Sequence, residues 1–308
     1  MSTLIEFDEV CKYYQMGDTL VKAADHVSFK INKGEFVAIV GQSGSGKSTC
    51  MNIIGCLDVP TEGTYLLDGR DVGKMSRREL ASIRNEKLGF IFQQYNLLPK
   101  LTLLENVEVP LVYAGIPAAQ RHATAEAALE RVGLGNKLKN LPNQLSGGQQ
   151  QRIALARALV ISPDVLLMDE PLSNLDAKLR VEMRSVIRHT QKSVGITTVY
   201  VTHDQEEAMA ISDRIAVMKD GVIQHVGTPR DIYQRPKNVF VATFIGRTNI
   251  VNAHVKDGII TFADGYHEHI DALDKAAEQD VRCSIRPEEF IICKDGTDGI
   301  HGTVQECT

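Results

Sequence analysis

The segment GQSGSGKST, residues 41–49, has the spacing of glycine, lysine and hydroxyl residues that suits phosphate binding. Its glycines would let the backbone fold into a concave nest of N–H donors around phosphate oxygens. Lys47 would reach the outer phosphates, and the Ser48 hydroxyl would hold Mg²⁺. The segment follows the apolar run FVAIV and opens a helical pattern, so nucleotide binding is favoured over a flexible turn. The residues assigned to this cradle are Gly41, Gln42, Ser43, Gly44, Ser45, Gly46, Lys47, Ser48 and Thr49.

Two carboxylates end the apolar run VLLM and could complete a phosphate-processing site. Asp169 is a candidate Mg²⁺ ligand, and Glu170 could orient or deprotonate an attacking water. A solvated acidic turn is the competing interpretation of such a pair. Gln93, in GFIFQQYNLLP, could contact metal or water, and His203, in VYVTHD, could bind the terminal phosphate. Ligands of open α/β sheets gather at the carboxyl edge of the strands, where these residues would meet.

The stretch NQLSGGQQQRIALARALV, residues 143–160, has a bare, polar start followed by strong helix formers. Ser146 could cap the first turn of this helix. Capping does not require Gly147 and Gly148, each of which costs about 1 kcal/mol relative to Ala in a helix. The two glycines leave backbone N–H groups uncovered, and an uncovered helix N-terminus is an anion site.

Strands and helices alternate along most of the chain, which indicates an α/β fold. FVAIV, VLLMDE and TTVYVT are predicted to be buried parallel strands, and residues 118–132 and 176–193 have helical patterns. RIAVMKDGVIQHV predicts a hairpin because Asp-Gly is a strong turn signal. From about residue 249, short strand-like pieces ending in GTVQE predict a small β domain that is truncated as it stands.

Composition narrows the function classes. The chain has 308 residues and a net charge of −5, which argues against nucleic-acid binding. Its six cysteines are scattered without metal-like spacing, so we expect free thiols in a reducing compartment. No signal peptide is apparent, and no apolar run approaches the about 20 residues needed to span a bilayer. At a membrane, another chain would have to do the spanning.

The cradle, Gln93, LSGGQ, LLMDEP and His203, in this order, resemble the ATPase subunits of ABC transporters over almost the whole chain. The resemblance implies a P-loop ATPase domain at residues 1–245, with a helical subdomain at about 94–162. An OB-like regulatory β domain would follow at 246–308. It also implies ATP and Mg²⁺ as ligands and an active ATPase, with Lys47, Gln93, Glu170 and His203 as catalytic residues. Ser48, Gln93 and Asp169 would bind the metal.

The resemblance further implies that each reaction centre needs two chains. The LSGGQ segment of one copy would face the ATP held by a second copy in a head-to-tail homodimer. Asp176, in the SNLD loop, would link the two sites, and Tyr14 would stack on adenine, with Tyr13 as the neighbouring candidate. The dimer would drive an integral membrane permease from the cytoplasmic face of the cell membrane. The residues presented to the second copy's ATP are Leu145, Ser146, Gly147, Gly148 and Gln149.

The two halves resemble different branches of that family. The first is similar to lipoprotein-releasing and macrolide-exporter ATPases. The second, from about residue 160, is similar to importer ATPases for sugars, glycerol phosphate or polyamines. Two explanations of this mixture are possible, a natural mixed subfamily and a chain recombined from two parents. The difference in sequence character between the two halves favours the recombined chain. Import is favoured over export because of the appended β domain. A soluble ABC ATPase, a regulatory module with a vestigial ATPase, and a metal site at His267 and His269 are the less favoured hypotheses.

Overall fold

The computed structural model describes residues 2–291 and 299–300. The chain divides into two compact units, Met1–Arg230 and Asp231–Thr308. The predicted final strand GTVQE, and Cys293 and Cys307, lie outside the described residues. Among those described, Cys11, Cys50, Cys56 and Cys283 are free thiols, as the scattered spacing predicted.

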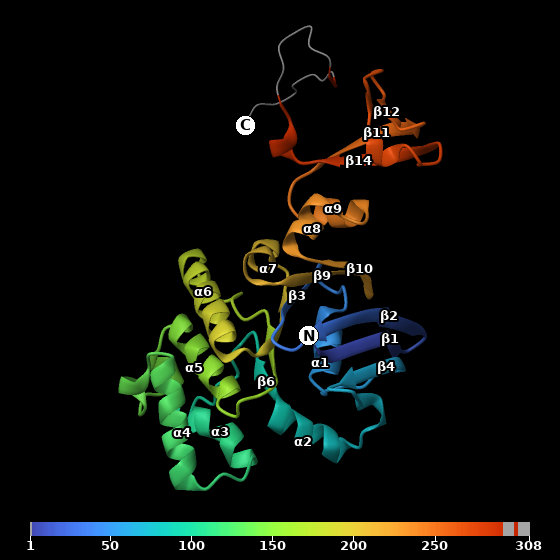
Figure 1. Ribbon diagram of the computed structural model, residues 1–308. Helices are drawn as coiled ribbons and strands as arrows, with labels where there is room; N and C mark the ends of the chain where they lie inside the picture. The colour runs from blue at the N-terminus through green and yellow to red at the C-terminus, as the bar shows by residue number, and fades with distance from the viewer. Residues whose placement is uncertain (1, 292–298, 301–308) are drawn as a thin grey trace. The chain divides into compact units, whose positions relative to one another are not determined.

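A six-stranded sheet in the order β10-β9-β3-β8-β7-β6 forms the centre of the first unit (Figure 1). Five strands run parallel, and the sixth, β10, is antiparallel to β9. The predicted apolar runs are its middle strands, and the Asp-Gly turn joins the predicted hairpin. The strands are β3 (Phe36–Gly41), β6 (Leu88–Ile91), β7 (Val165–Asp169), β8 (Thr197–Thr202), β9 (Arg214–Lys219) and β10 (Val222–Gly227).

Helices cover both faces of this sheet, which explains why its strands are apolar on both sides. On β7, Val165 and Leu167 pack on the face that carries α1 (Lys47–Ile54). Leu166 and Met168 point to the opposite face. That second face carries α5 (Gly147–Leu159), α6 (Ala177–Val194) and α7 (Gln205–Ile211).

A second sheet, in the order β2-β1-β4-β5, is antiparallel and packs with α1 into one core. Its strands are β1 (Thr3–Met16), β2 (Thr19–Asn32), β4 (Glu62–Leu67) and β5 (Arg70–Asp71). This sheet is not predicted from the sequence. The β1–β2 ladder shifts register at several points, so the two-residue alternation that identifies a strand is broken. A 3₁₀ turn (Val72–Lys74) and α2 (Arg77–Lys87) follow.

The helical part of the first unit consists of α3 (Leu103–Tyr113), α4 (Ala118–Arg131) and α5, which share one apolar core (Figure 1). Thr102 begins α3 in a capping box with Glu105, so the backbone N–H groups of Thr102 and Glu105 each have a side-chain acceptor. Two 3₁₀ turns, Gly135–Lys137 and Pro142–Gln144, lead from α4 to the start of α5.

The second unit contains a four-stranded antiparallel sheet in the order β13-β12-β11-β14. It bears out the strand-like pieces predicted after residue 249. The strands are β11 (Asn249–Lys256), β12 (Ile259–Phe262), β13 (His267–His269) and β14 (Gln279–Ile285). The helices are α8 (Pro229–Gln234), which crosses the division, α9 (Val239–Phe244), and the 3₁₀ turns Asp271–Leu273 and Pro287–Glu289.

No helix in the described parts of the chain combines the length and the apolar character that crossing a bilayer requires.

Candidate functional site

The cradle is the loop between β3 and α1. Gly46 begins α1 with a left-handed φ of 98°, and a Cβ added there would lie 2.2 Å from the Ala23 carbonyl oxygen. Only glycine fits a position that is both left-handed and this close to backbone. Lys47 is buried, and its ammonium donates to the carbonyls of Gly41 at 2.9 Å and Gln42 at 2.8 Å. The loop therefore holds its lysine directly beneath the helix start.

The cradle presents donors that have no partner within the chain. Among the described residues, the backbone N–H groups of Gly44, Gly46, Lys47 and Ser48 donate no hydrogen bond. The Ser45 hydroxyl is buried and likewise unpartnered. Buried polar groups are normally hydrogen-bonded, so an anion at this helix N-terminus fits the donor set.

Glu170 and His203 meet at the carboxyl edge of the sheet. His203 Nδ1 lies 3.1 Å from Glu170 Oε1. Glu170 adopts a left-handed φ of 43°, and its own N–H donates to the Val201 carbonyl at 2.9 Å. Ser173 Oγ donates to the Glu170 carbonyl at 2.9 Å. These bonds hold a strained backbone in place, as is common at functional sites.

Asp169 and Lys47 influence each other's charge across this edge. Burial raises the pKa of Asp169, the neighbouring Glu170 adds to the rise, and Lys47 opposes it. Burial lowers the pKa of Lys47, against the attraction of Glu170 and Asp169. Asp169 is half-buried and Ser48 is exposed, and a carboxylate and a hydroxyl are oxygen ligands of the type that Mg²⁺ prefers. The donor set therefore fits a metal-bound triphosphate.

A buried carboxylate that the sequence reasoning did not identify supports the His203 loop. Glu207, on α7, accepts from the Tyr200 hydroxyl at 2.8 Å and the Thr202 hydroxyl at 3.0 Å. Asp204, next to His203, caps α7 by accepting from the N–H groups of Glu206 and Glu207. The pattern Asp-x-Glu-Glu at residues 204–207 could have indicated the start of this helix, because acidic residues are favoured in the first helical turn.

Gln93 is exposed and follows β6, so it lies at the same edge as the other candidates. Its carbonyl accepts from Asn174 Nδ2 at 2.8 Å. Just beyond it, Tyr95 and Asn96 have left-handed φ values, and their carbonyls accept from the Arg157 guanidinium at 2.5 Å and 2.7 Å. Arg157 of α5 thus ties the Gln93 loop to the helical part.

Tyr14 keeps part of its ring exposed near the cradle. Its hydroxyl donates to Asp58 at 2.9 Å, and the Lys12 ammonium lies 5.2 Å from its ring centroid. Burial and the Asp58 bond raise the pKa of Tyr14, with Thr49 of the cradle acting in the opposite direction. The neighbouring Tyr13 donates to Asp25 at 2.6 Å and is tied to β2 instead.

The LSGGQ segment begins α5, with Ser146 exposed at the N-cap position. The Ser146 hydroxyl accepts no hydrogen bond from the helix; instead its N–H donates to Gln149 Oε1 at 3.2 Å. The first-turn N–H groups therefore stay open, and Ser146 does not cap them as the sequence suggested. Gly148 has a second reason to be glycine, because an added Cβ would lie 2.9 Å from the Leu179 side chain of α6.

The two elements predicted to bind phosphate lie on opposite faces of the central sheet. α1 belongs to the core on one face, and α5 to the core on the other. Figure 1 accordingly draws α1 and α5 well apart within the first unit. Asp176, also predicted at the site, caps α6 by accepting from the Leu179 N–H at 2.9 Å.

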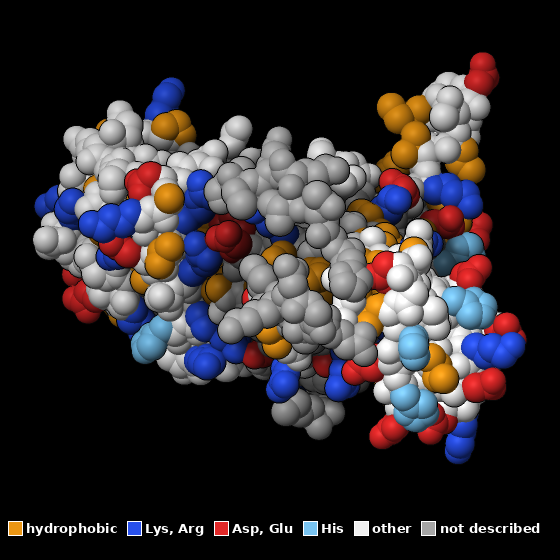
Figure 2. Space-filling view, turned by 90° about the horizontal axis from the view of Figure 1, so that it is seen from above, with side chains coloured by type: hydrophobic (Ala, Val, Ile, Leu, Met, Phe, Trp, Pro, Cys, Tyr) orange, Lys and Arg blue, Asp and Glu red, His pale blue; other side chains and the backbone are white. Residues whose placement is uncertain are grey.

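The predicted histidine pair lies on β13 in the second unit, away from the candidates above in the sequence. Figure 2 shows histidine side chains close to acidic side chains on part of the molecular surface. His269 pairs with Asp274 at 2.9 Å and with Asp271 at 3.4 Å, while His267 Nδ1 lies 3.3 Å from the Gly265 carbonyl. The structure therefore does not bring His267 and His269 together on one ligand set.

Comparison with known proteins decides the family. The family model described as ABC transporter matches residues 24–173. The Fe(3+) ions import ATP-binding protein FbpC of Fusobacterium nucleatum is 46% identical over 306 residues, covering 99% of this chain and 80% of that protein. The chain belongs to the ABC transporter ATP-binding proteins. As an ABC ATPase it binds ATP with Mg²⁺ and hydrolyses it to drive transport.

Relatives of both predicted branches are found. The spermidine/putrescine import protein PotA of Thermobifida fusca is 42% identical over 98% of this chain and 79% of that protein. The macrolide export ATP-binding/permease protein MacB of Brucella abortus is 47% identical over 75% of this chain and 35% of that protein. Among solved structures, the dimeric cassette MJ0796 bound to ADP and Pi has a TM-score of 0.67 and 42% identity, covering 74% of this chain and 99% of its own.

Proposed function

We propose that this ABC ATPase works as a head-to-tail dimer of two copies on an integral membrane permease and that it drives import. One structural observation supports the proposal of a dimer. The cradle on α1 and the open N-terminus of α5 are separated by the central sheet, so one chain does not wrap both around one phosphate. A second copy, turned by a twofold axis, supplies the missing element to each site.

Each proposed site divides its work between two chains. The cradle residues 41–49 bind the phosphates of ATP, and Tyr14 stacks on the adenine. Glu170 polarises the attacking water, and His203 and Lys47 bind the terminal phosphate. Mg²⁺, held by Ser48, Asp169 and Gln93, would neutralise phosphate charge. The remaining donors come from the second copy, in residues 145–149, with Asp176 in the loop between the two sites.

The test is dimerisation and turnover in two variants. Glu170→Gln should lower ATP hydrolysis by about 10²–10⁴-fold, the usual contribution of a general base, and accumulate an ATP-bound dimer in light scattering. Adding Ser146→Arg should return that protein to a monomer, because the arginine occupies the open α5 terminus. Ser193→Arg, on an exposed turn at the end of α6, is the matched control. Full turnover by a Ser146→Arg monomer would refute the shared site.

A groove of about 1240 Å³ between α2 and the helical part is the proposed permease site. Its lining combines exposed apolar side chains, Leu57 and Tyr113, with the cations Arg78 and Arg84. Exposed apolar surface rimmed by charge is typical of interaction sites. The resemblance to the family implies that the permease docks on the segment between Gln93 and Leu145, which includes Tyr113. The name of MacB, a relative, joins an ATP-binding part and a permease in one protein.

Co-purification from membranes tests the groove. Tyr113→Asp should release the permease while leaving basal ATPase intact. Val194→Asp, which changes another exposed apolar side chain at the end of α6, should release nothing. If the Tyr113→Asp variant still retains a permease, the groove is not the docking site. If the protein co-purifies with ribosomes instead of membranes, the soluble ABC ATPase is favoured.

The second unit favours import as the direction of transport. The importer relatives align over 98–99% of this chain, whereas MacB aligns over 230 residues, which leaves part of the chain without a counterpart. We therefore propose that residues 1–245 form the ATPase domain and 246–308 an OB-like regulatory domain of an importer. The complex would sit on the cytoplasmic face of the membrane. A macrolide-type or lipoprotein-releasing exporter is the runner-up. Uptake assays with the co-purified permease decide between them.

A further inference from the structure

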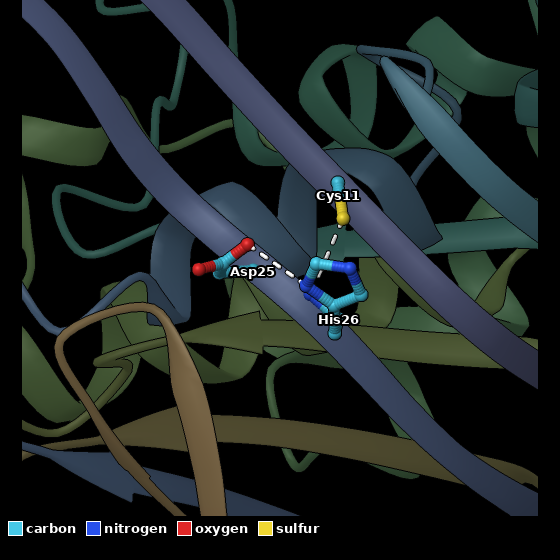
Figure 3. Close-up of side chains that lie close together, drawn as sticks. All are labelled: Cys11, Asp25 and His26. Carbon is cyan, nitrogen blue, oxygen red and sulfur yellow. Dashed lines mark hydrogen bonds and ion pairs between the residues drawn. The ribbon is translucent and has the colours of Figure 1, made fainter.

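A cysteine, an aspartate and a histidine meet where β1 and β2 pair. Cys11 lies on β1, and Asp25 and His26 are consecutive on β2. One ligand-type atom from each, a sulfur, a carboxylate oxygen and an imidazole nitrogen, lies within 4.8 Å of the other two. Figure 3 shows the three side chains gathered across the two strands. None of them takes part in the proposed ATP site.

An irregular ladder brings the two β2 residues together. Consecutive strand residues normally point to opposite faces of a sheet. Here Val10 pairs with Val27 and Lys12 pairs with Ala24, so Asp25 and His26 both oppose Cys11. Such a bulge re-aims side chains, and His26 adopts a left-handed φ of 51° to make it. The left-handed conformation costs about 1–2 kcal/mol in a residue with a Cβ. The surrounding strands therefore hold His26 in a backbone conformation that is locally unfavourable.

We propose that Cys11, Asp25 and His26 bind one divalent transition-metal cation of borderline softness, with Zn²⁺ as the representative and water as the fourth ligand. This set of sulfur, nitrogen and oxygen donors is one that zinc takes in tetrahedral sites. His26 Nδ1 lies 3.0 Å from Asp25 Oδ1. Two ligands about 2.0–2.1 Å from a tetrahedral zinc lie roughly 3.3 Å apart, so this pair is almost in place.

The charge balance also suits a divalent ion. A Cys11 thiolate and the Asp25 carboxylate together neutralise two positive charges. Binding releases the thiol proton to solvent and requires the proton-free form of His26 Nδ1. Hydrogen bonds from Tyr13 and then Lys22 keep the pKa of Asp25 below its ordinary value, so the carboxylate is ionised at neutral pH.

One group opposes the cation. The Lys22 ammonium lies 3.2 Å from the second oxygen of Asp25, but its side chain is about half exposed and can turn into solvent. The His26 imidazole is 61% exposed and leaves a route to the buried Cys11 sulfur. Since Asp25 Oδ1 faces both His26 and the Tyr13 hydroxyl, metal binding should displace Tyr13.

The cluster adjoins the segment of β2 that walls the cradle. The Ala23 carbonyl lies against Gly46, and the Asp25 N–H donates to the Gly221 carbonyl at 2.9 Å. A metal that fixes Asp25 and His26 would therefore restrain the strand on which the cradle rests. We expect bound metal to change the rate of ATP hydrolysis, as a second readout after binding itself.

Titration of the reduced, nucleotide-free full chain with Co²⁺ tests the site. The expected result is one equivalent bound with a sulfur-to-cobalt charge-transfer absorption, displaced by Zn²⁺. Cys11→Ser should abolish that absorption. His26→Asn, which tolerates the left-handed backbone, should weaken binding at least about tenfold, since even outer-shell changes cost 10–100-fold. His269→Gln, in the exposed His269, Asp271 and Asp274 cluster, is the matched control and should change nothing.

Three outcomes overturn the proposal: no charge-transfer absorption in the wild-type chain, absorption that survives His26→Asn at full affinity, or binding that is lost with His269→Gln. The exposed His26 variant keeps the test valid if the buried Cys11 variant does not fold. Because no nucleotide is present, failure here leaves the proposed ATPase dimer untouched.

Discussion

The substitution Gly46→Ala tests the geometry of the cradle, with Gly44→Ala as its matched control. Both glycines are left-handed, with φ values of 98° and 77°. A Cβ at Gly44 meets nothing within 4 Å, whereas a Cβ at Gly46 lies 2.2 Å from the Ala23 carbonyl oxygen. The two substitutions therefore share a conformational cost and differ in one backbone collision.

The magnitude follows from those two terms. A left-handed alanine costs about 1–2 kcal/mol at either position. At Gly46 the backbone of β2 must also move, and forcing extra atoms into a packed site adds about 1–3 kcal/mol. We expect Gly44→Ala to lower ATP affinity by about tenfold and Gly46→Ala by roughly 100-fold or more, at about 1.4 kcal/mol per factor of ten.

Titration with a fluorescent ATP analogue, together with thermal unfolding of the nucleotide-free protein, measures both parts of the cost. If the loop relaxes in the Gly46 variant, the loss appears in affinity; if it does not, the loss appears in the unfolding temperature. Equal behaviour of the Gly44 and Gly46 variants in both measurements would refute the close approach of Ala23 as the constraint.

Three further outcomes are expected. Burial raises the folded-state pKa of Asp169, so the ionised carboxylate destabilises the fold once the pH has risen through that pKa. The nucleotide-free Asp169→Asn variant should therefore unfold at a higher temperature than wild type at pH 7. This gain in unfolding temperature should vanish below pH 3.8, the ordinary pKa of an aspartate. Arg157→Ala should destabilise the protein by about 1.5–3 kcal/mol in urea unfolding, because the Tyr95 and Asn96 carbonyls lose a charged donor, and unchanged stability would contradict this. Asp176→Ala should cost about 1 kcal/mol through the lost α6 cap, while Asp176→Asn, also a good cap, keeps the unfolding temperature; equal loss in both would remove the cap explanation.

The parallel sheet and its hairpin were predictable because their signals are local. FVAIV and VLLM are unbroken apolar runs, TTVYVT is rich in β-branched residues, and all three lie in central strands. The hairpin turn places Asp220 and Gly221 in left-handed conformations, φ 50° and 79°, which is why Asp-Gly identified it. Because the central strands are parallel, the candidate residues that follow them lie at the same edge of the sheet.

The antiparallel sheet was not predictable, for a physical reason that also hid the Cys11 cluster. β1 reads TLIEFDEVCKYYQM, and its buried positions alternate only from Ile5 to Phe7. Glu9 and His26 are both left-handed, and the ladder shifts beside each of them. A bulge resets the face to which side chains point, so no fixed period in the sequence places Cys11 next to Asp25 and His26.

Gly148 shows why the start of α5 cannot be interpreted from exposure alone. From the sequence, Gly147 and Gly148 are both predicted to leave the N–H groups of the first helical turn uncovered. In the structure the two differ: Gly147 is exposed, whereas Gly148 is buried against the Leu179 side chain of α6. α6 begins at the Asp176 cap, so the packing at Gly148 also sets where the SNLD loop lies relative to the open N–H groups. Gly148 therefore contributes both to the proposed anion site and to the position of the loop proposed to reach the second copy, and a bulkier residue there should disturb both together.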